Sequence, residues 1–430
     1  MQKDINGLIS MLEGSVSPHH AVEYARNLLD AEGFTALEQA KPWELHRGGK
    51  YYVSCFNTML MAFVVGSECR GGDGFRLAAS HIDWPCFYIK PSPEKTEAGC
   101  LKLSIEPYGG MIFNTWLDRP LSVAGMVTLR GENVLCPERR LIDMKKPLFT
   151  IPNLAIHMNR EVNKGVELNA ARDLLPICRT VEKEWSKDGY FVKKLAEHMN
   201  VSADDILSYD LCLYNAEKSC FIGFDEDFLS APRLDNITSS FACLAGIANC
   251  GIKHGVSAAI LFDNEEVGSQ TKQGANSSLL GMLLEKLAFA LGMTRPEYID
   301  SLMNGFMLSC DVAHAKHPNR AELSDPSCNA VMNSGVTLKM NYEQRYATEA
   351  TGIGIIEGLC KKYDIPYQRF MNRPDLRGGG TLGSYASANL AMRTADIGVP
   401  MLAMHSAREL MGRYDQDALN RLVEAYFAEE

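Results

Sequence analysis

The chain has 430 residues, of which 46% are hydrophobic and 22% are charged, a composition typical of a globular protein. This length exceeds that of most single hydrophobic cores, so two domains are expected. The formal net charge of -10 and the pI near 5.6 give no electrostatic reason to bind nucleic acid or an anionic membrane. The sequence has neither an N-terminal signal core nor an apolar run of about 18 residues, so no membrane span is expected. The 13 cysteines are scattered and form no Cys-x-x-Cys pair, which favours a reducing cytoplasm over a disulfide framework or a thiolate zinc site.

The N-terminal half changes its periodicity twice. The first 50 residues are predicted to be helical, with Ser17 as an N-cap and Pro18 at the first helical position. Two strands are then expected, separated by a glycine-rich turn. From residue 91 to about 230, strand-like pieces alternate with polar loops and predict a β-rich region that contains one helix near 188–200. The expected strands are 61–66, 75–79, 101–105, 112–117, 123–129 and 148–156.

After residue 231 the sequence alternates between helical and strand-like segments. Strands are expected from 258 and at 306–309, and helices at 239–249, 277–291, 347–363 and around 387–390. The economical interpretation is an α/β domain formed by 1–90 and 231–430. An inserted β-rich domain, 91–230, interrupts it.

Five short acidic or histidine motifs each follow an apolar run that is typical of a buried strand. Side chains just past the carboxyl ends of parallel strands converge on one crevice of the sheet. Taken singly, each motif has an ordinary structural explanation, such as a helix N-cap for Asp235 or a turn for Asp311. Taken together, the motifs predict a metal site. They contribute His81 with Asp83, Asp235, Glu265 with Glu266, Asp311, and His405.

These residues supply what a two-metal hydrolase requires. Such a centre needs a bridging carboxylate and further ligands for each ion, and it generates hydroxide near neutral pH. Asp235 is the expected bridge. His81 and Asp311 would complete one ion, and Glu266 and His405 the other. Mixed imidazole and carboxylate ligation suits zinc and tolerates cobalt or manganese.

Two further carboxylates have expected roles beside the metals. Glu265 is the candidate general base, because neighbours in an extended segment point to opposite sides and Glu266 is assigned to metal. Asp83 lies two residues after His81 and is expected to orient its imidazole.

The amino-acid sequences of several segments closely resemble the signatures of the M18 metalloaminopeptidases, the aspartyl aminopeptidase family. The resemblance spans nearly the whole chain. It implies a zinc-peptidase α/β sandwich domain with an inserted dimerisation domain, assembly of dimers into a dodecamer, and removal of N-terminal residues, typically acidic ones, from peptides. The matching segments are 17–22, 151–157, 262–269, 311–319, 344–348 and 404–409.

The resemblance assigns the same metal ligands and the same catalytic Glu265. It adds His157 as a substrate contact that reaches a neighbouring subunit's site, and Lys339 as a partner for a substrate carboxylate. On the residues alone, His157 is more typical of a packed histidine and Lys339 of a solvated lysine.

Two departures from the family pattern leave the substrate preference open. The chain has Gly380 and Ser384 in the glycine-rich turn segment, and Trp84 directly after Asp83, where the family usually has other residues. The alternatives are an aminopeptidase with neutral-residue specificity, a two-metal deacylase of N-acylated amino acids, and a non-catalytic metal-stabilised scaffold. An unligated glutamate at position 265 argues against the scaffold.

Overall fold

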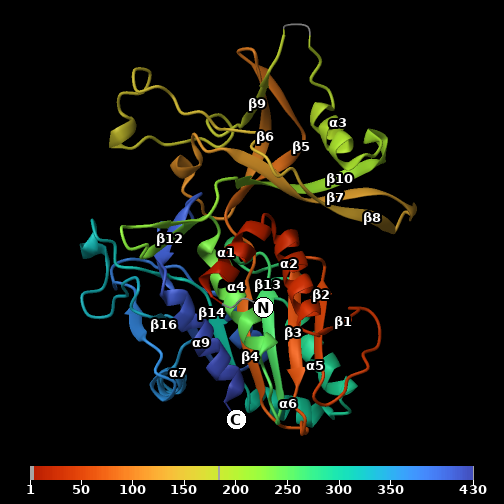
Figure 1. Cartoon of the computed structure of the whole chain (residues 1–430), viewed down its shortest axis with the longest axis vertical. Coiled ribbons are helices and arrows are strands. Elements are labelled where there is room, and N and C mark those ends of the chain that lie inside the picture. Colours follow the sequence, from red (N-terminus) through yellow and green to blue (C-terminus); the bar gives the residue numbers. More distant parts are fainter. Residues whose placement is uncertain (1–3, 183–184, 430) are drawn as a thin grey trace. The chain divides into compact units, whose positions relative to one another are not determined.

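The computed structural model describes residues 4–182 and 185–429 and divides into two compact units. The first unit contains the described residues of 1–83, 219–404 and 409–430, and the second contains those of 84–218 together with 405–408. Figure 1 traces both along the chain. Within the described ranges, no helix is long and apolar enough to cross a membrane.

The first unit is built on a nine-stranded mixed sheet with the order β1-β2-β3-β13-β4-β14-β18-β16-β17. Its central strands β13, β4, β14 and β18 run parallel to one another. The strands β3 and β13 are buried along their whole length, which requires cover on both faces of the sheet. The bounds are Thr35–Leu37 (β1), Lys50–Cys55 (β2), Met59–Val65 (β3), Phe75–His81 (β4), Val256–Phe262 (β13), Phe306–Cys310 (β14), Val336–Met340 (β16), Tyr367–Met371 (β17) and Thr394–Gly398 (β18).

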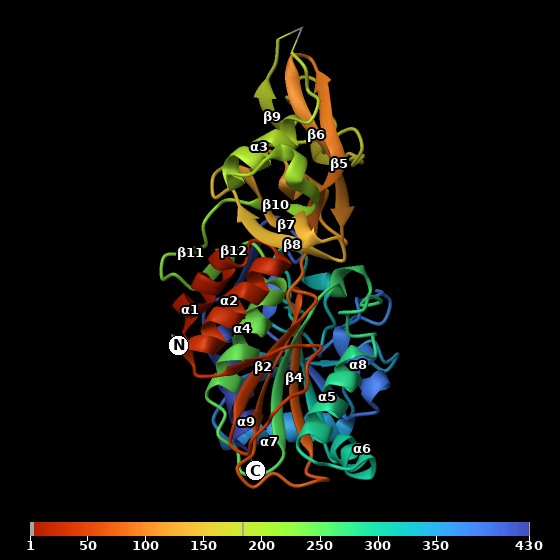
Figure 2. The same ribbon diagram turned by 90° about the vertical axis from the view of Figure 1, so that its right-hand side faces the viewer.

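Helices supply that cover from both sides, as Figure 2 shows. One face carries α1, α2 and α4, with α9 packed on α4 and α7 on α9, and the other carries α5, α6 and α8. A continuous apolar core fills the space between the sheet and α5, α6 and α8. The bounds are Ile5–Gly14 (α1), Pro18–Ala31 (α2), Leu234–Ala248 (α4), Leu279–Ala290 (α5), Arg295–Met303 (α6), Ala350–Lys362 (α7), Leu382–Leu390 (α8) and Asp415–Ala428 (α9).

The first unit also contains a small five-stranded sheet with the order β11-β12-β20-β19-β15. It brings the segment that follows β14 next to the segment that follows β18, because β15 pairs with β19. The bounds are Cys220–Ile222 (β11), Phe228–Ala231 (β12), Ala313–His314 (β15), Pro400–Leu402 (β19) and Glu409–Gly412 (β20).

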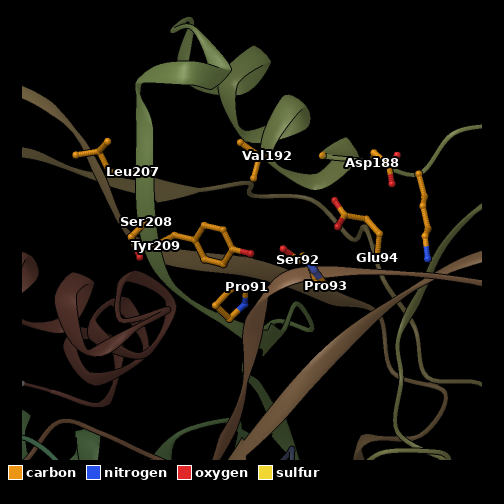
Figure 3. A pocket seen from close by; sticks show the side chains of 11 residues that line it. Pro91, Ser92, Pro93, Glu94, Asp188, Val192, Leu207, Ser208 and Tyr209 are labelled. Atoms are coloured by element: carbon orange, nitrogen blue, oxygen red, sulfur yellow. The ribbon is translucent and has the colours of Figure 1, made fainter.

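The second unit is a six-stranded antiparallel sheet, β8-β7-β10-β5-β6-β9, with helix α3 packed on it. The rings of Phe191 in α3 and Tyr209 in β10 lie 5.6 Å apart, edge to face. Beside this contact lies a cavity of about 460 Å³, lined in part by Glu94, Asp188 and Tyr209 (Figure 3). The bounds are Cys86–Glu97 (β5), Cys100–Tyr108 (β6), Leu121–Asn133 (β7), Cys136–Asp143 (β8), Ile177–Thr180 (β9), Ile206–Asn215 (β10) and Tyr190–Met199 (α3).

Most of the helices expected from the sequence are present, and three local predictions were wrong. The helices near 188–200, 239–249, 277–291 and 347–363 are confirmed as α3, α4, α5 and α7. The first 50 residues are helical only to Ala31, after which the chain continues into β1.

The other two errors concern expected strands. The segment 112–117 forms a 3-10 turn, Phe113–Trp116, because the Thr115 hydroxyl and N–H both donate to the Ile112 carbonyl and compete with ladder bonds. In the segment 148–156, pairing is confined to isolated bridges at 149–151, since Pro152 has no N–H to donate.

Candidate metal centre

Three neighbouring parallel strands of the large sheet, β4, β13 and β14, end at or lead into most of the expected ligands. His81 is the last residue of β4, and Asp311 directly follows β14, which pairs with β4. The strand β13 pairs with β4 on its other side and leads into the short helix η4, Glu265–Val267. Asp235 lies in the first turn of α4. The first unit therefore gathers these side chains at the carboxyl edge of its sheet.

The gathered side chains form a compact donor set. One ligand atom each from His81, Asp235 and Glu266 lies within 4.8 Å of the other two. Nε2 of His81 lies 3.4 Å from Oδ1 of Asp235 and 3.5 Å from Oδ1 of Asp311. One imidazole and several carboxylates that converge on a common point fit a zinc ion, whose ligands are nitrogen and oxygen atoms of this kind.

Asp83 holds two parts of the centre at once. Its Oδ1 accepts the N–H of Glu265 and its Oδ2 accepts the N–H of Glu266, both at 3.1 Å. Nδ1 of His81 lies 3.1 Å from the Asp83 carbonyl oxygen and 3.3 Å from its Oδ1. A proton on Nδ1 satisfies these oxygens and leaves Nε2 facing Asp235 and Asp311 as an electron-pair donor.

The concentration of negative charge perturbs the titration of these groups. Burial opposes protonation of His81, but its contacts with Asp235, Asp311 and Asp83 outweigh burial and raise its pKa well above the usual range. Burial raises the pKa of Glu265 to about 8; the charge of His81 opposes this rise, and the neighbouring carboxylates add to it. Perturbed acids and bases that share one crevice are typical of catalytic sites.

Two of the expected site residues belong to the second unit. His405 is partly exposed, and its Nδ1 lies 2.8 Å from the carbonyl oxygen of Gly110 in the same unit. His157 lies in an exposed loop of that unit. The metal role of His405 and the substrate role of His157 stay predictions.

Lys339 is buried, with 1% of its surface accessible. Its Nζ lies 3.5 Å from Oδ2 of Asp311, donates to the carbonyl oxygen of Val312 at 2.9 Å, and sits 5.1 Å above the ring of Tyr346. Its positive charge is therefore already paired with Asp311, and the solvated lysine expected from the residues alone was wrong.

Two residues that had no assigned role contact the backbone beside the candidate ligands. Glu409 accepts the backbone N–H of Asp235 through Oε2 at 3.1 Å. Asn236 donates through Nδ2 to the carbonyl oxygen of Cys310 at 2.9 Å, which ties the chain beside Asp235 to the chain beside Asp311. Both lie in motifs that stood out in the sequence, but only the fold shows which backbone group each one binds.

Comparison with known proteins identifies the family. Residues 11–427 match the family model described as aminopeptidase I zinc metalloprotease (M18). The chain is 42% identical over 411 residues to a probable M18 family aminopeptidase 2 of Clostridium novyi, which covers 95% of each chain.

Solved structures give the same result for the fold. A chain of the Ape4 and Nbr1 complex superposes with a TM-score of 0.93 at 31% identity, covering 98% of this chain and 85% of that one. The mApe1 dodecamer of S. cerevisiae gives a TM-score of 0.84 at 26% identity, covering 98% and 96%. The α/β peptidase fold expected from the sequence is thereby confirmed. The chain belongs to the M18 family of aminopeptidase I zinc metalloproteases and is a metallo-hydrolase of the aminopeptidase class.

Proposed function

We propose that this aminopeptidase uses two zinc ions to hydrolyse the N-terminal peptide bond of peptides, with a preference for acidic N-terminal residues. Cobalt or manganese would substitute for zinc. The observation that carries the proposal is the convergence of His81, Asp235 and Glu266 within 4.8 Å, with Glu265 adjacent in the same short helix.

In this proposal, His81, Asp235, Glu266 and Asp311 hold metal, and His405 completes the set. Zinc, when bound, polarises the scissile carbonyl and lowers the pKa of water. Glu265 accepts the proton of the attacking water and returns it to the leaving amine, a task for which an acid with a raised pKa is suited. Asp83 keeps Glu265 in place through its bond to the backbone N–H.

The acidic preference rests on positive charge beside a metal ligand. Lys339 is buried and contacts Asp311, so a substrate carboxylate would share this lysine with Asp311. A charge-assisted hydrogen bond in a site shielded from water contributes about 1.5 to 3 kcal/mol. This corresponds to a preference of roughly ten- to a hundredfold in kcat/KM for Asp or Glu over Leu or Ala.

The assembly part of the proposal is a homo-oligomer in the cytoplasm, with residues 91–230 as the dimerisation domain and a dodecamer as the final state. The exposed loop around His157 also exposes Leu154 to 57% and Met158 to 75%. Exposed apolar side chains on both sides of His157 in the sequence favour burial of this loop against a second subunit.

The central experiment is a substrate panel tested on metal-reconstituted protein. Aminoacyl substrates with free α-amines are compared with N-acylated amino acids, before and after chelation and after return of zinc, cobalt or manganese. We expect cleavage only of the free-amine substrates and only with metal. Full activity in protein shown by elemental analysis to be metal-free would refute the metal mechanism, and faster cleavage of the N-acyl substrates would identify a deacylase.

The acidic preference is tested with Lys339→Met and judged by a ratio. Because Lys339 also contacts Asp311, the absolute rate is expected to fall for every substrate. The informative quantity is kcat/KM for Asp and Glu substrates divided by that for Leu and Ala, which the variant should reduce to about one. A wild-type enzyme that prefers Leu or Met would refute the acidic assignment and leave the aminopeptidase activity intact.

The assembly is tested by light scattering and by subunit mixing. A monomer at micromolar concentration would refute the interface. If His157 serves a neighbouring site, mixing His157→Ala subunits with Glu265→Gln subunits should regenerate sites that carry both intact groups. Confirmed subunit exchange without regained activity would place His157 in its own subunit.

A further inference from the structure

Asp396 is a fully buried carboxyl group on an interior strand of the large sheet. It lies in β18, between β14 and β16, opposite Ser309 on one side and Lys339 on the other. It is the only acidic residue of that strand. A buried carboxylate inside a sheet is unfavourable unless charge and hydrogen bonds compensate, so its contacts indicate why it is there.

Those contacts fasten two separate loops to the sheet. The Ala347 N–H donates to Oδ2 of Asp396 at 2.6 Å, and the Asp396 N–H donates to the Thr348 hydroxyl at 2.8 Å. The hydroxyl of Thr381, the N-cap residue of α8, donates to Oδ1 at 2.5 Å. One residue thus fixes both the segment before α7 and the start of α8.

One of these loops and the strand beside Asp396 lead back to a proposed metal ligand, Asp311. Tyr346, directly before Ala347, lies beneath the Nζ of Lys339, and that Nζ lies 3.5 Å from Asp311. Lys339 is also the cross-strand partner of Asp396. Asp396 therefore controls, through one loop and one neighbouring strand, the two side chains that stand behind Asp311.

Glycine at position 383 shows how closely α8 approaches this carboxylate. A Cβ atom at this position would lie 2.7 Å from Oδ1 of Asp396 and 2.6 Å from the hydroxyl oxygen of Ser309. No ordinary packing allows such distances, so the absence of a side chain at Gly383 is what lets Thr381 reach Asp396.

We propose that Asp396 is a positioning residue for peptide binding. It holds the 345–348 segment and the start of α8 so that Tyr346 and Lys339 keep one arrangement beside Asp311. It acts through these neighbours and does not itself touch the reacting atoms. The inference rests on the proposed function, because its kinetic consequence is a defect in the binding of the peptide's N-terminal residue.

The chain offers a matched control for a buried carboxylate that braces a loop. Asp415, at the start of α9, is also fully buried and accepts the N–H groups of Asn333 and Gly335 at 2.6 and 2.8 Å. These N–H groups belong to the turn at residues 333–335, which contains no proposed metal ligand or substrate contact. Asp396→Asn and Asp415→Asn each replace a buried carboxyl group that anchors a loop by an amide of the same shape. A difference between the two variants therefore reports where in the fold the anchor lies.

The test compares wild type, Asp396→Asn and Asp415→Asn for kcat, KM, bound metal and hydrogen exchange by mass spectrometry. We expect Asp396→Asn to keep its metal, to raise KM, and to lose kcat/KM on the order of 10- to 100-fold, as misplaced contacts do. Exchange should accelerate in 341–348 and 377–383 only in this variant. Asp415→Asn should keep wild-type kinetics.

Kinetic constants or exchange in Asp396→Asn that match wild type, or that match Asp415→Asn, would overturn the inference. If Asp396→Asn does not fold, Thr381→Val removes one of the same bonds and should shift KM in the same direction by less; unchanged KM and exchange in Thr381→Val would overturn it equally. If wild type and Asp415→Asn cleave no peptide, the proposed function has failed, and hydrogen exchange still decides the role of Asp396.

Discussion

Replacement of Glu265 by glutamine separates the proposed base from its metal-binding neighbour. Glu265 and Glu266 are anchored alike, since one carboxylate, Asp83, accepts both backbone N–H groups at 3.1 Å. Glutamine is isosteric with glutamate and leaves these backbone anchors intact. Glu265→Gln and Glu266→Gln therefore each change only the head group of the side chain. Glu265→Gln should keep its metal and lose turnover by about 10² to 10⁴-fold, because an amide cannot accept the water's proton.

That loss corresponds to about 3 to 5 kcal/mol of activation free energy, well above the uncertainty of a kinetic assay. Glu266→Gln should instead lose metal at one site, because an amide is a weaker and neutral ligand. The assay pairs initial rates on an aminoacyl substrate with metal counted per subunit by elemental analysis. Equal metal content and equal activity in the two variants would refute the division of roles.

Three further outcomes follow from packing and titration. Gly383→Ala should destabilise the protein by about 1 to 3 kcal/mol relative to Gly358→Ala, since a Cβ at Gly383 overlaps Ser309 whereas one at Gly358 meets nothing within 4 Å; equal denaturation midpoints would contradict this. Alkylation followed by mass spectrometry should label the exposed thiols of Cys136 and Cys220 well before that of Cys55, since burial raises the pKa of Cys55 to about 11; early labelling of Cys55 would show that its strand opens. Burial also raises the pKa of Asp415 to about 7, so this acid ionises more readily in the unfolded chain, and its contribution to stability declines as pH rises from about 4 to 7; thermal melts of Asp415→Asn should show a smaller decline over that range, and an unchanged slope would contradict the assignment.

The sequence predicted most of the helices that cover the large sheet and the residues that gather at its edge. The success at the edge has a physical reason. Ligands that directly follow apolar runs need no long-range information beyond the rule that parallel strands end together. His81 and Asp311 illustrate this, since each is fixed by the end of its own strand.

The residues that the sequence left without a role act at long range. Asp396 looks like an isolated acid in an apolar strand, and only the pairing of β18 with β14 and β16 shows what surrounds it. A charged residue inside an otherwise apolar run was the available signal, because such a residue must find partners. Lys339 is the converse case: nothing in its own segment distinguishes a solvated lysine from one buried against Asp311.

The negative charge gathered in the first unit supports the proposal of two divalent ions over one. Five carboxylates gather around His81, those of Asp83, Asp235, Glu265, Glu266 and Asp311. If His81 is neutral, as a ligand must be, and all five carboxylates are ionised, the contact of Lys339 with Asp311 offsets one negative charge and leaves four. Like charges about 4 Å apart repel by about 4 kcal/mol at the effective dielectric constant of a protein, so the group is costly without cations. One divalent ion would leave half of that excess uncompensated, whereas two would neutralise it while Glu265 is ionised and able to act as a base.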